Sequence, residues 1–139
     1  MQGSVAIAVA VAVISLAACG SSTSDAPVRR TLERGLAQIS KPQTAKQLRD
    51  DLVGTLARLR RESGSTPTAR KGRTLAIQGF TWTLRGIDAE LELIRNDSGN
   101  LEASVQDAKR SDRDRRRGAK LLRAAGRALG VQVGDLGGF

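Results

Sequence analysis

Residues 67–94 read PTARKGRTLAIQGFTWTLRGIDAELELI, and this stretch decides the fold. Thr66 and Pro67 suit the cap and the first position of a helix. The apolar residues that follow are spaced alternately three and four apart, as on one face of a helix; they are Ile77, Phe80, Leu84, Ile87, Leu91 and Ile94. The pattern predicts a helix of about 30 residues, roughly 45 Å long at 1.5 Å per residue.

A stripe of small residues runs beside this apolar face; it consists of Gly72, Ala76, Gly79, Thr83 and Gly86. Glycine within a helix costs about 1 kcal/mol relative to alanine. Three glycines at seven-residue intervals therefore indicate a face where another backbone comes close. The alternative is a weak helix that bends at the glycines.

The next helix is expected to begin after Asn100, with Glu102 in its first turn, and to end at Gly130. Its apolar face holds Leu101, Val105, Ala108, Ala119, Leu122, Gly126 and Leu129. The same heptad places Asp112 and Arg115 on that face, and the sequence leaves open whether they are buried. A short turn over residues 96–100 makes the two long helices antiparallel. Counting outward from Ser98 puts three carboxylates near Lys109 and Arg110; they are Asp88, Glu90 and Glu92.

Two shorter helices precede the long ones. After Pro27, the apolar positions at helical spacing are Val28, Leu32, Leu36 and Ile39; after a break at residues 40–43 they are Ala45, Leu48, Leu52, Leu56 and Leu59. Two capping boxes compete to start the second helix, Ser40 with Gln43 and Thr44 with Gln47. We expect an all-α, up-down bundle of four helices, in which the two long helices form an antiparallel hairpin. A long hairpin with a separate shorter hairpin is the alternative.

The start of the chain carries a different pattern. Residues 5–18 are almost entirely Ala, Val, Ile and Leu, which is too short to span a bilayer and suits a secretory signal. This stretch ends in the run Leu16-Ala17-Ala18-Cys19, and Cys19 is the single cysteine of the chain. This run resembles the lipobox of bacterial lipoproteins, although residues 1–4 lack the usual Lys or Arg. An uncleaved apolar segment with a chance cysteine is the alternative.

The resemblance implies a domain organisation and a location. Leu16, Ala17 and Ala18 would be recognised by the signal peptidase, and Cys19 would carry a diacylglyceryl anchor on the extracytoplasmic face of the cell membrane. Residues 1–18 would be the signal peptide and residues 19–26 a flexible tether. Residues 27–130 would form the helical bundle, followed by a loosely ordered, Gly-rich tail over residues 131–139.

The chain is strongly basic, with 23 Lys and Arg against 14 Asp and Glu, a formal net charge of +9. The up-down topology gathers many cations where the first helix begins: Arg29, Arg30, Arg58, Arg60, Arg61, Arg70, Lys71, Arg73, Arg123 and Arg127. The helix dipole explains those at the ends of helices two and four, but it opposes those at the starts of helices one and three.

We therefore predict contact with an anionic surface, namely membrane lipids or acidic cell-wall polymers. The residues assigned to this contact are Arg29, Arg30, Arg70, Lys71, Arg73, Arg123 and Arg127. A solvated helix end in an Arg-rich chain is the alternative.

The densest basic run is KRSDRDRRR, residues 109–117. On a helix its charges spread around the whole circumference, and no aromatic residue is interleaved for base stacking. A cytoplasmic nucleic-acid-binding protein is the alternative function if the N-terminal signal is misread. Export argues against nucleic acid as a partner and favours an unknown envelope protein.

The composition argues against an enzyme. The chain contains no histidine, which removes the commonest general base and the commonest metal ligand. Asp88 and Glu92 lie one helical turn apart, yet helical di-metal sites also need Glu-x-x-His pairs. We expect no catalytic residue, metal or cofactor, and we assign Trp82 to the core or to the wall of a groove. The expected function is a non-enzymatic, lipid-anchored binding or structural module.

Overall fold

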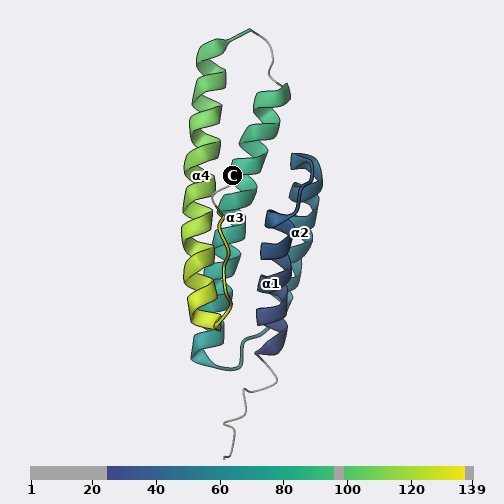
Figure 1. Cartoon of the computed structure of the whole chain (residues 1–139), viewed down its shortest axis with the longest axis vertical. Helices are drawn as coiled ribbons and strands as arrows, with labels where there is room; N and C mark the ends of the chain where they lie inside the picture. Colours follow the sequence, from purple (N-terminus) through teal and green to yellow (C-terminus); the bar gives the residue numbers. More distant parts are fainter. Residues whose placement is uncertain (1–24, 96–98, 137–139) are drawn as a thin grey trace, which may run out of the picture.

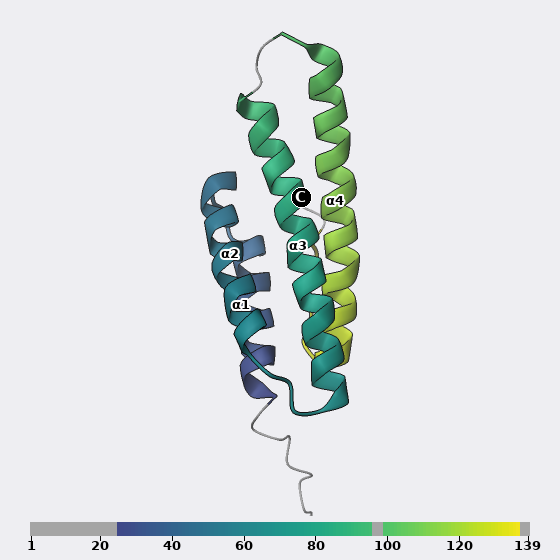
Figure 2. The ribbon, with the colours of Figure 1, turned by 180° about the vertical axis from the view of Figure 1, so that it is seen from behind.

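The computed structural model describes residues 25–95 and 99–136. Within these ranges the chain forms four helices and no strand: α1 (Ala26–Ser40), α2 (Ala45–Arg61), α3 (Pro67–Arg95) and α4 (Leu101–Leu129). Neighbouring helices alternate in direction, and α3 and α4 form a long hairpin with α1 and α2 beside its lower part (Figures 1 and 2). The expected all-α, up-down bundle with a long hairpin is confirmed.

The helix ends follow local capping chemistry. Of the two possible capping boxes the chain uses Thr44 with Gln47: the Thr44 hydroxyl accepts from the Gln47 backbone N–H at 3.2 Å, and the Gln47 side chain accepts from the Thr44 N–H at 3.1 Å. Thr66 caps α3 by accepting from the Ala69 N–H at 3.1 Å. Asn100 caps α4, and Gly130 ends it in the left-handed conformation with φ of 64°.

The α3–α4 interface is built on the small-residue stripe. Gly72, Gly79 and Gly86 face α4, and a Cβ atom added to Gly79 would lie 2.8 Å from Cγ of Leu122 and 3.1 Å from its backbone nitrogen. The Ser111 hydroxyl donates to the Gly86 carbonyl across this interface at 2.8 Å. The predicted close approach of a second backbone is confirmed.

The register of the hairpin differs from the count made outward from Ser98. Gly72 packs against Leu129 and Gly79 against Leu122, so the two helices pair about the Asn100–Leu101 position. This register places Glu92 level with Lys109, but the described ion pairs do not join the acidic residues of α3 to Lys109 or Arg110. Asp88 instead binds Arg49 of α2, and Glu90 forms an ion pair with Arg115. Arg110 lies 3.9 Å from Asp107 of its own helix.

The core lies in the lower part of the molecule, where the α1–α2 hairpin packs against the long one. Its fully buried side chains include Val28, Leu32, Leu52, Leu59, Phe80, Ile87 and Leu122. The upper ends of α3 and α4 extend beyond α1 and α2 (Figure 1). Ile94, Leu101 and Val105 are there 64%, 78% and 42% exposed, so the expected apolar face of α4 is buried only below this tip.

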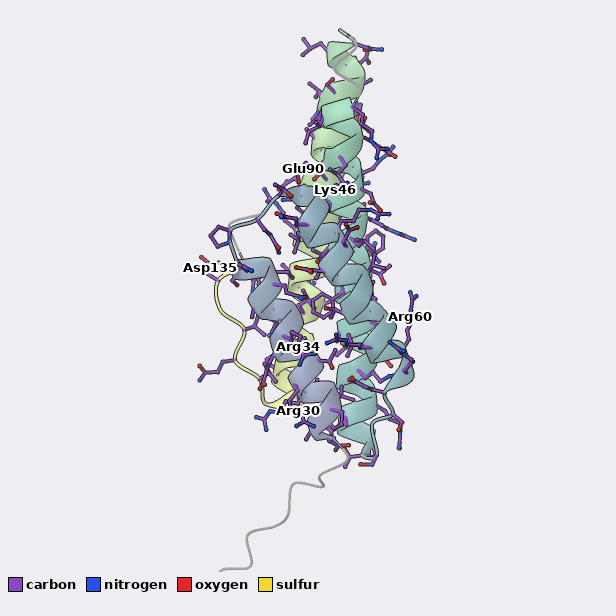
Figure 3. The ribbon with its side chains drawn as sticks, turned by 90° about the vertical axis from the view of Figure 1, so that its right-hand side faces the viewer. Arg30, Arg34, Lys46, Arg60, Glu90 and Asp135 are labelled. Atoms are coloured by element: carbon purple, nitrogen blue, oxygen red, sulfur yellow. The ribbon has the colours of Figure 1, made fainter. Side chains whose placement is uncertain are left out.

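The segment after α4 is part of the packed domain. Val131 and Leu136 are buried in the core cluster, and Val133 packs against it. The segment runs back along α4 on the side of α1 (Figures 1 and 3). The expectation of a loosely ordered tail is therefore wrong for residues 131–136, because these apolar side chains find a groove that only the tertiary structure creates.

Candidate functional site

The candidate site is the lower end of the bundle, where α1 and α3 begin and α2 and α4 end (Figure 1). The first or last two turns of each helix bring together all ten cations expected there, whereas Asp25, Glu33 and Glu62 are the carboxylates of these turns and their flanks. Figure 3 shows Arg30 and Arg60 on the outer sides of α1 and α2. The topology therefore concentrates positive charge at one end, as predicted.

Two of the arginines whose charge opposes the dipole of their own helix form hydrogen bonds with the end of a neighbouring helix. Arg29 of α1 donates from Nη2 to the Gly130 carbonyl at the end of α4, at 2.6 Å. Arg73 of α3 donates to the last turn of α2, from Nε to the Leu59 carbonyl at 2.6 Å and from Nη2 to the Arg60 carbonyl at 2.8 Å. A cation at a helix C-terminus is favourable, so antiparallel packing explains both residues without an external ligand.

Arg70 and Asp25 form further hydrogen bonds at this end of the bundle, both with the segment that precedes α3. Arg70 donates from Nη1 to the Ser65 carbonyl at 2.9 Å. The Asp25 carboxylate accepts from the Ser65 hydroxyl at 2.7 Å and from the Thr66 hydroxyl at 2.6 Å. It also accepts from the backbone N–H groups of Ser65 and Thr66. The Thr66 and Ser65 hydroxyls, followed by those N–H groups, lower the pKa of Asp25 from 3.8 to about 2. Sequence reasoning did not identify this link between Asp25 and α3.

Six of the seven predicted contact residues are exposed, and four of these six have no polar partner within the described part of the chain. Arg30, Lys71, Arg123 and Arg127 are exposed, and among the described residues they make no hydrogen bond or ion pair. Arg123 and Arg127 line a shallow hollow of about 350 Å³ together with Val131, Gln132 and Val133. The structure thus divides the predicted set into three structural arginines and four cations that are available to a partner.

A second cavity, of about 410 Å³, lies where the loop between α1 and α2 meets the middle of the long hairpin. Arg115 and Glu90 form an ion pair in its wall, and the Arg115 side chain is only 16% exposed. Burial lowers the pKa of Arg115. Leu48 and Leu136 contribute apolar surface to the same wall.

Asp112 and Arg115, the two charged residues that the heptad places on the apolar face of α4, have different surroundings in the structure. Arg115 is turned inward and paired, whereas Asp112 is exposed and accepts from Arg116 one turn later at 3.0 Å. Ser111 and Asp114 are the buried polar residues of this region, at 9% and 6% exposure. The apolar spacing of α4 does not reveal these two, because Ser and Asp are polar side chains that are mostly exposed in proteins.

The aromatic and acidic residues considered for chemistry have structural partners. Trp82 is half-buried, with the guanidinium carbons of Arg85 and Arg117 at 4.8 and 4.0 Å from its ring. Asp88 accepts from Nε of Arg49 at 2.7 Å, which raises the pKa of that arginine. Residues 25–95 and 99–136 contain no group of three His, Cys, Asp or Glu side chains placed to hold a metal ion.

The predicted lipidation site, Cys19, and the peptidase residues Leu16, Ala17 and Ala18 lie outside the described residues. None of the four described helices is long and apolar enough to cross a membrane. No protein-family model matches the chain, and neither the curated proteins nor the solved structures include a match.

Proposed function

We propose that this protein is a lipid-anchored component of the bacterial cell envelope, a non-enzymatic helical module with its basic end against the membrane. The lipobox-like run supplies Cys19 as the lipidated residue. α1 begins at Ala26, seven residues later, which allows a reach of about 25 Å in an extended chain. The anchor and the basic end of the bundle would therefore meet the same membrane surface.

The observation that carries the proposal is the set of exposed cations at that end. Arg30, Lys71, Arg123 and Arg127 come from α1, α3 and α4 and are exposed. Near an anionic leaflet each such charge contributes about 1 kcal/mol, and the attraction falls off within a Debye length of about 8 Å. A diacyl anchor with a basic surface provides the two signals that stable membrane attachment requires.

The anchor is tested by intact mass and fractionation of the protein expressed in a related bacterium, wild type beside Cys19→Ala. We expect a mature chain that starts at a diacylated Cys19, is found in the membrane fraction and is lost in the variant. An unprocessed, unlipidated and soluble wild-type chain would contradict the anchor. That outcome would favour nucleic-acid binding through the exposed residues of the 109–117 run, among which Arg113 and Arg116 have side chains 74% and 80% exposed.

The basic surface is tested separately with a lipid-free chain of residues 20–139 and vesicles of phosphatidylcholine with or without phosphatidylglycerol. We expect binding only to the anionic vesicles, with weakening at high salt. Replacing Arg30, Lys71, Arg123 and Arg127 by Gln should abolish most of it. The matched control replaces four exposed cations of the α4 run instead: Lys109, Arg110, Arg113 and Arg116. Equal loss in both variants would mean that only net charge matters, and the proposed orientation would be wrong.

A further inference from the structure

The outer face of α4 carries a row of cations that runs along the helix. Its members follow one another alternately four and three residues apart, the spacing that keeps side chains on one face of a helix; they are Lys109, Arg113, Arg116, Lys120, Arg123 and Arg127. All of them are exposed, and we call this row the α4 ridge. The ridge is about 27 Å long, at 1.5 Å per residue.

The packing of the bundle leaves this face of α4 to solvent. Figures 1 and 2 show α4 at the edge of the molecule, on the side away from α2. Ser111 and Gly118 are buried against α3, and Arg115 is turned inward to Glu90. The expectation that the charges of residues 109–117 spread around the whole helix is therefore wrong for the exposed cations, which share the outer half of α4.

The α4 ridge destabilises its own helix, because like charges three or four residues apart repel each other. Two of its members have a carboxylate nearby: Arg116 pairs with the exposed Asp112 at 3.0 Å, and Arg113 lies 3.4 Å from the buried Asp114. The other four members make no hydrogen bond or ion pair among the described residues. A composition rich in arginine explains the number of cations but not their alignment on one face. The alignment therefore indicates an anionic partner that offsets the repulsion.

The shape of the ridge points to a linear partner. Neighbouring cations rise along the helix axis by about 4.5–6 Å. The cations beside the ridge are engaged elsewhere, since Arg110 lies 3.9 Å from Asp107 and the guanidinium carbon of Arg117 lies 4.0 Å from the centre of the Trp82 ring. A single row of this form matches an extended polymer that carries one negative charge per repeat.

The aromatic residues argue against a partner that carries bases. Proteins bind single-stranded nucleic acid through basic grooves combined with aromatic rings on which the bases stack. Phe80 is fully buried, and the ring of Trp82 already holds the guanidinium groups of Arg85 and Arg117. The described part of the chain therefore offers a row of cations for a backbone, and no unoccupied aromatic ring for a base.

We propose that the α4 ridge binds a linear, base-free phosphodiester polymer that lies along the helix. Lysine binds phosphate as a point charge and arginine through paired N–H donors, so each member of the ridge suits one phosphate. Contacts of the whole row with a single strand give a slope of about −4 for the logarithm of the binding constant against that of the salt concentration. The inference does not rest on the lipid anchor. The ridge shares Arg123 and Arg127 with the proposed membrane contact, so its test uses other members.

The probe is a fluorescein-labelled oligomer of 1,3-propanediol phosphate with eight phosphates, and the readout is fluorescence anisotropy with the lipid-free chain of residues 20–139. The ridge variant replaces three members of the ridge by Gln: Lys109, Arg116 and Lys120. The control variant replaces three exposed cations of the α1–α2 hairpin by Gln: Lys41, Lys46 and Arg60 (the last two are labelled in Figure 3). We expect the ridge variant to bind at least tenfold more weakly than the wild type, with a salt slope of about −2. The control variant should stay within about threefold of the wild type, because its cations lie away from α4.

Equal weakening in the two variants would overturn the proposal, since net charge alone would then set the affinity; circular dichroism checks that both keep the helicity of the wild type. A wild-type salt slope of about −1 would overturn it as well, because a row of contacts would not form. Oligothymidylate with the same number of phosphates should bind no more tightly than the probe. Tenfold tighter binding of oligothymidylate would assign the ridge to single-stranded nucleic acid instead. If the ridge variant lost its binding to phosphatidylglycerol vesicles as fully as its binding to the probe, the assignment to a linear polymer would be wrong.

Discussion

At the scale of single residues, Asp25 ties the start of α1 to the start of α3. Its carboxylate accepts from two hydroxyls and two backbone N–H groups of Ser65 and Thr66, and these bonds favour the ionised form. The pKa of Asp25 is about 2 in the folded chain and 3.8 as a model value. Because the folded pKa is the lower one, this contribution to stability is present above about pH 4 and is lost as the pH falls toward 2.

Asp25→Asn should lower the urea midpoint at pH 7 and reduce the fall in the midpoint between pH 5 and pH 2. The reason is that the variant lacks the group whose protonation breaks the link. Asp112→Asn is the control, because Asp112 is exposed and pairs only with Arg116 of its own helix in the described ion pairs. The same acid sensitivity in Asp25→Asn as in the wild type would mean that other carboxylates cause it.

Gly79 and Gly54 form a matched pair of helical glycines with opposite surroundings. A Cβ added to Gly79 would be forced against Leu122, whereas one added to Gly54 would meet nothing within 4 Å. Gly79→Ala should therefore destabilise the fold by about 1–3 kcal/mol through overpacking. Gly54→Ala should stabilise it by about 0.5–1 kcal/mol through helix propensity. Urea unfolding followed by circular dichroism measures both, and a stabilising Gly79→Ala would show that the helices separate easily.

At the scale of elements, a residue of α3 supplies the hydrogen bonds to the carbonyl groups in the last turn of α2. Arg73 bonds the Leu59 and Arg60 carbonyls, whereas Lys71, two residues earlier, is exposed and makes no such bond. Arg73→Met should cost about 1–2 kcal/mol of unfolding free energy. Lys71→Met should change it by less than about 0.5 kcal/mol. The same pair should behave oppositely with anionic vesicles, where the loss of Lys71 weakens binding more.

The four helices could be predicted because their signals are local. Apolar spacing, Thr66 with Pro67, the Thr44–Gln47 box and Gly130 all act within a few residues of the helix that they define. The caps supplied by Arg29, Arg73 and Asp25 could not be predicted, since each joins residues of different helices. The burial of residues 131–136 was missed for the same reason: a short Gly-containing stretch has no helical period, and its groove exists only after α1 and α4 are in place.

At the scale of the whole molecule, we expect the protection of backbone amides against hydrogen exchange to decrease from the lower end of the bundle to the tip of the long hairpin. The core lies where four helices and the C-terminal segment meet, and Ile94, Leu101 and Val105 are exposed above it. Hydrogen exchange followed by mass spectrometry should show slower exchange for residues 72–87 and 111–126 than for residues 88–95 and 101–108. Equal protection along both long helices would indicate that something covers the tip in solution.

The glycines of α3 also bear on how the two long helices find their alignment. Gly72, Gly79 and Gly86 recur every seven residues, and the side chains set against them, Leu129, Leu122 and Arg115, recur at the same interval. A slip of one heptad, about 10.5 Å, would again bring a glycine opposite a large residue, so shape alone permits several alignments. The ion pair of Arg115 with Glu90 distinguishes the observed alignment, because the residue seven positions before Glu90 is Thr83, which carries no charge. Replacing Glu90 by alanine therefore threatens the alignment of the hairpin before it threatens its helicity.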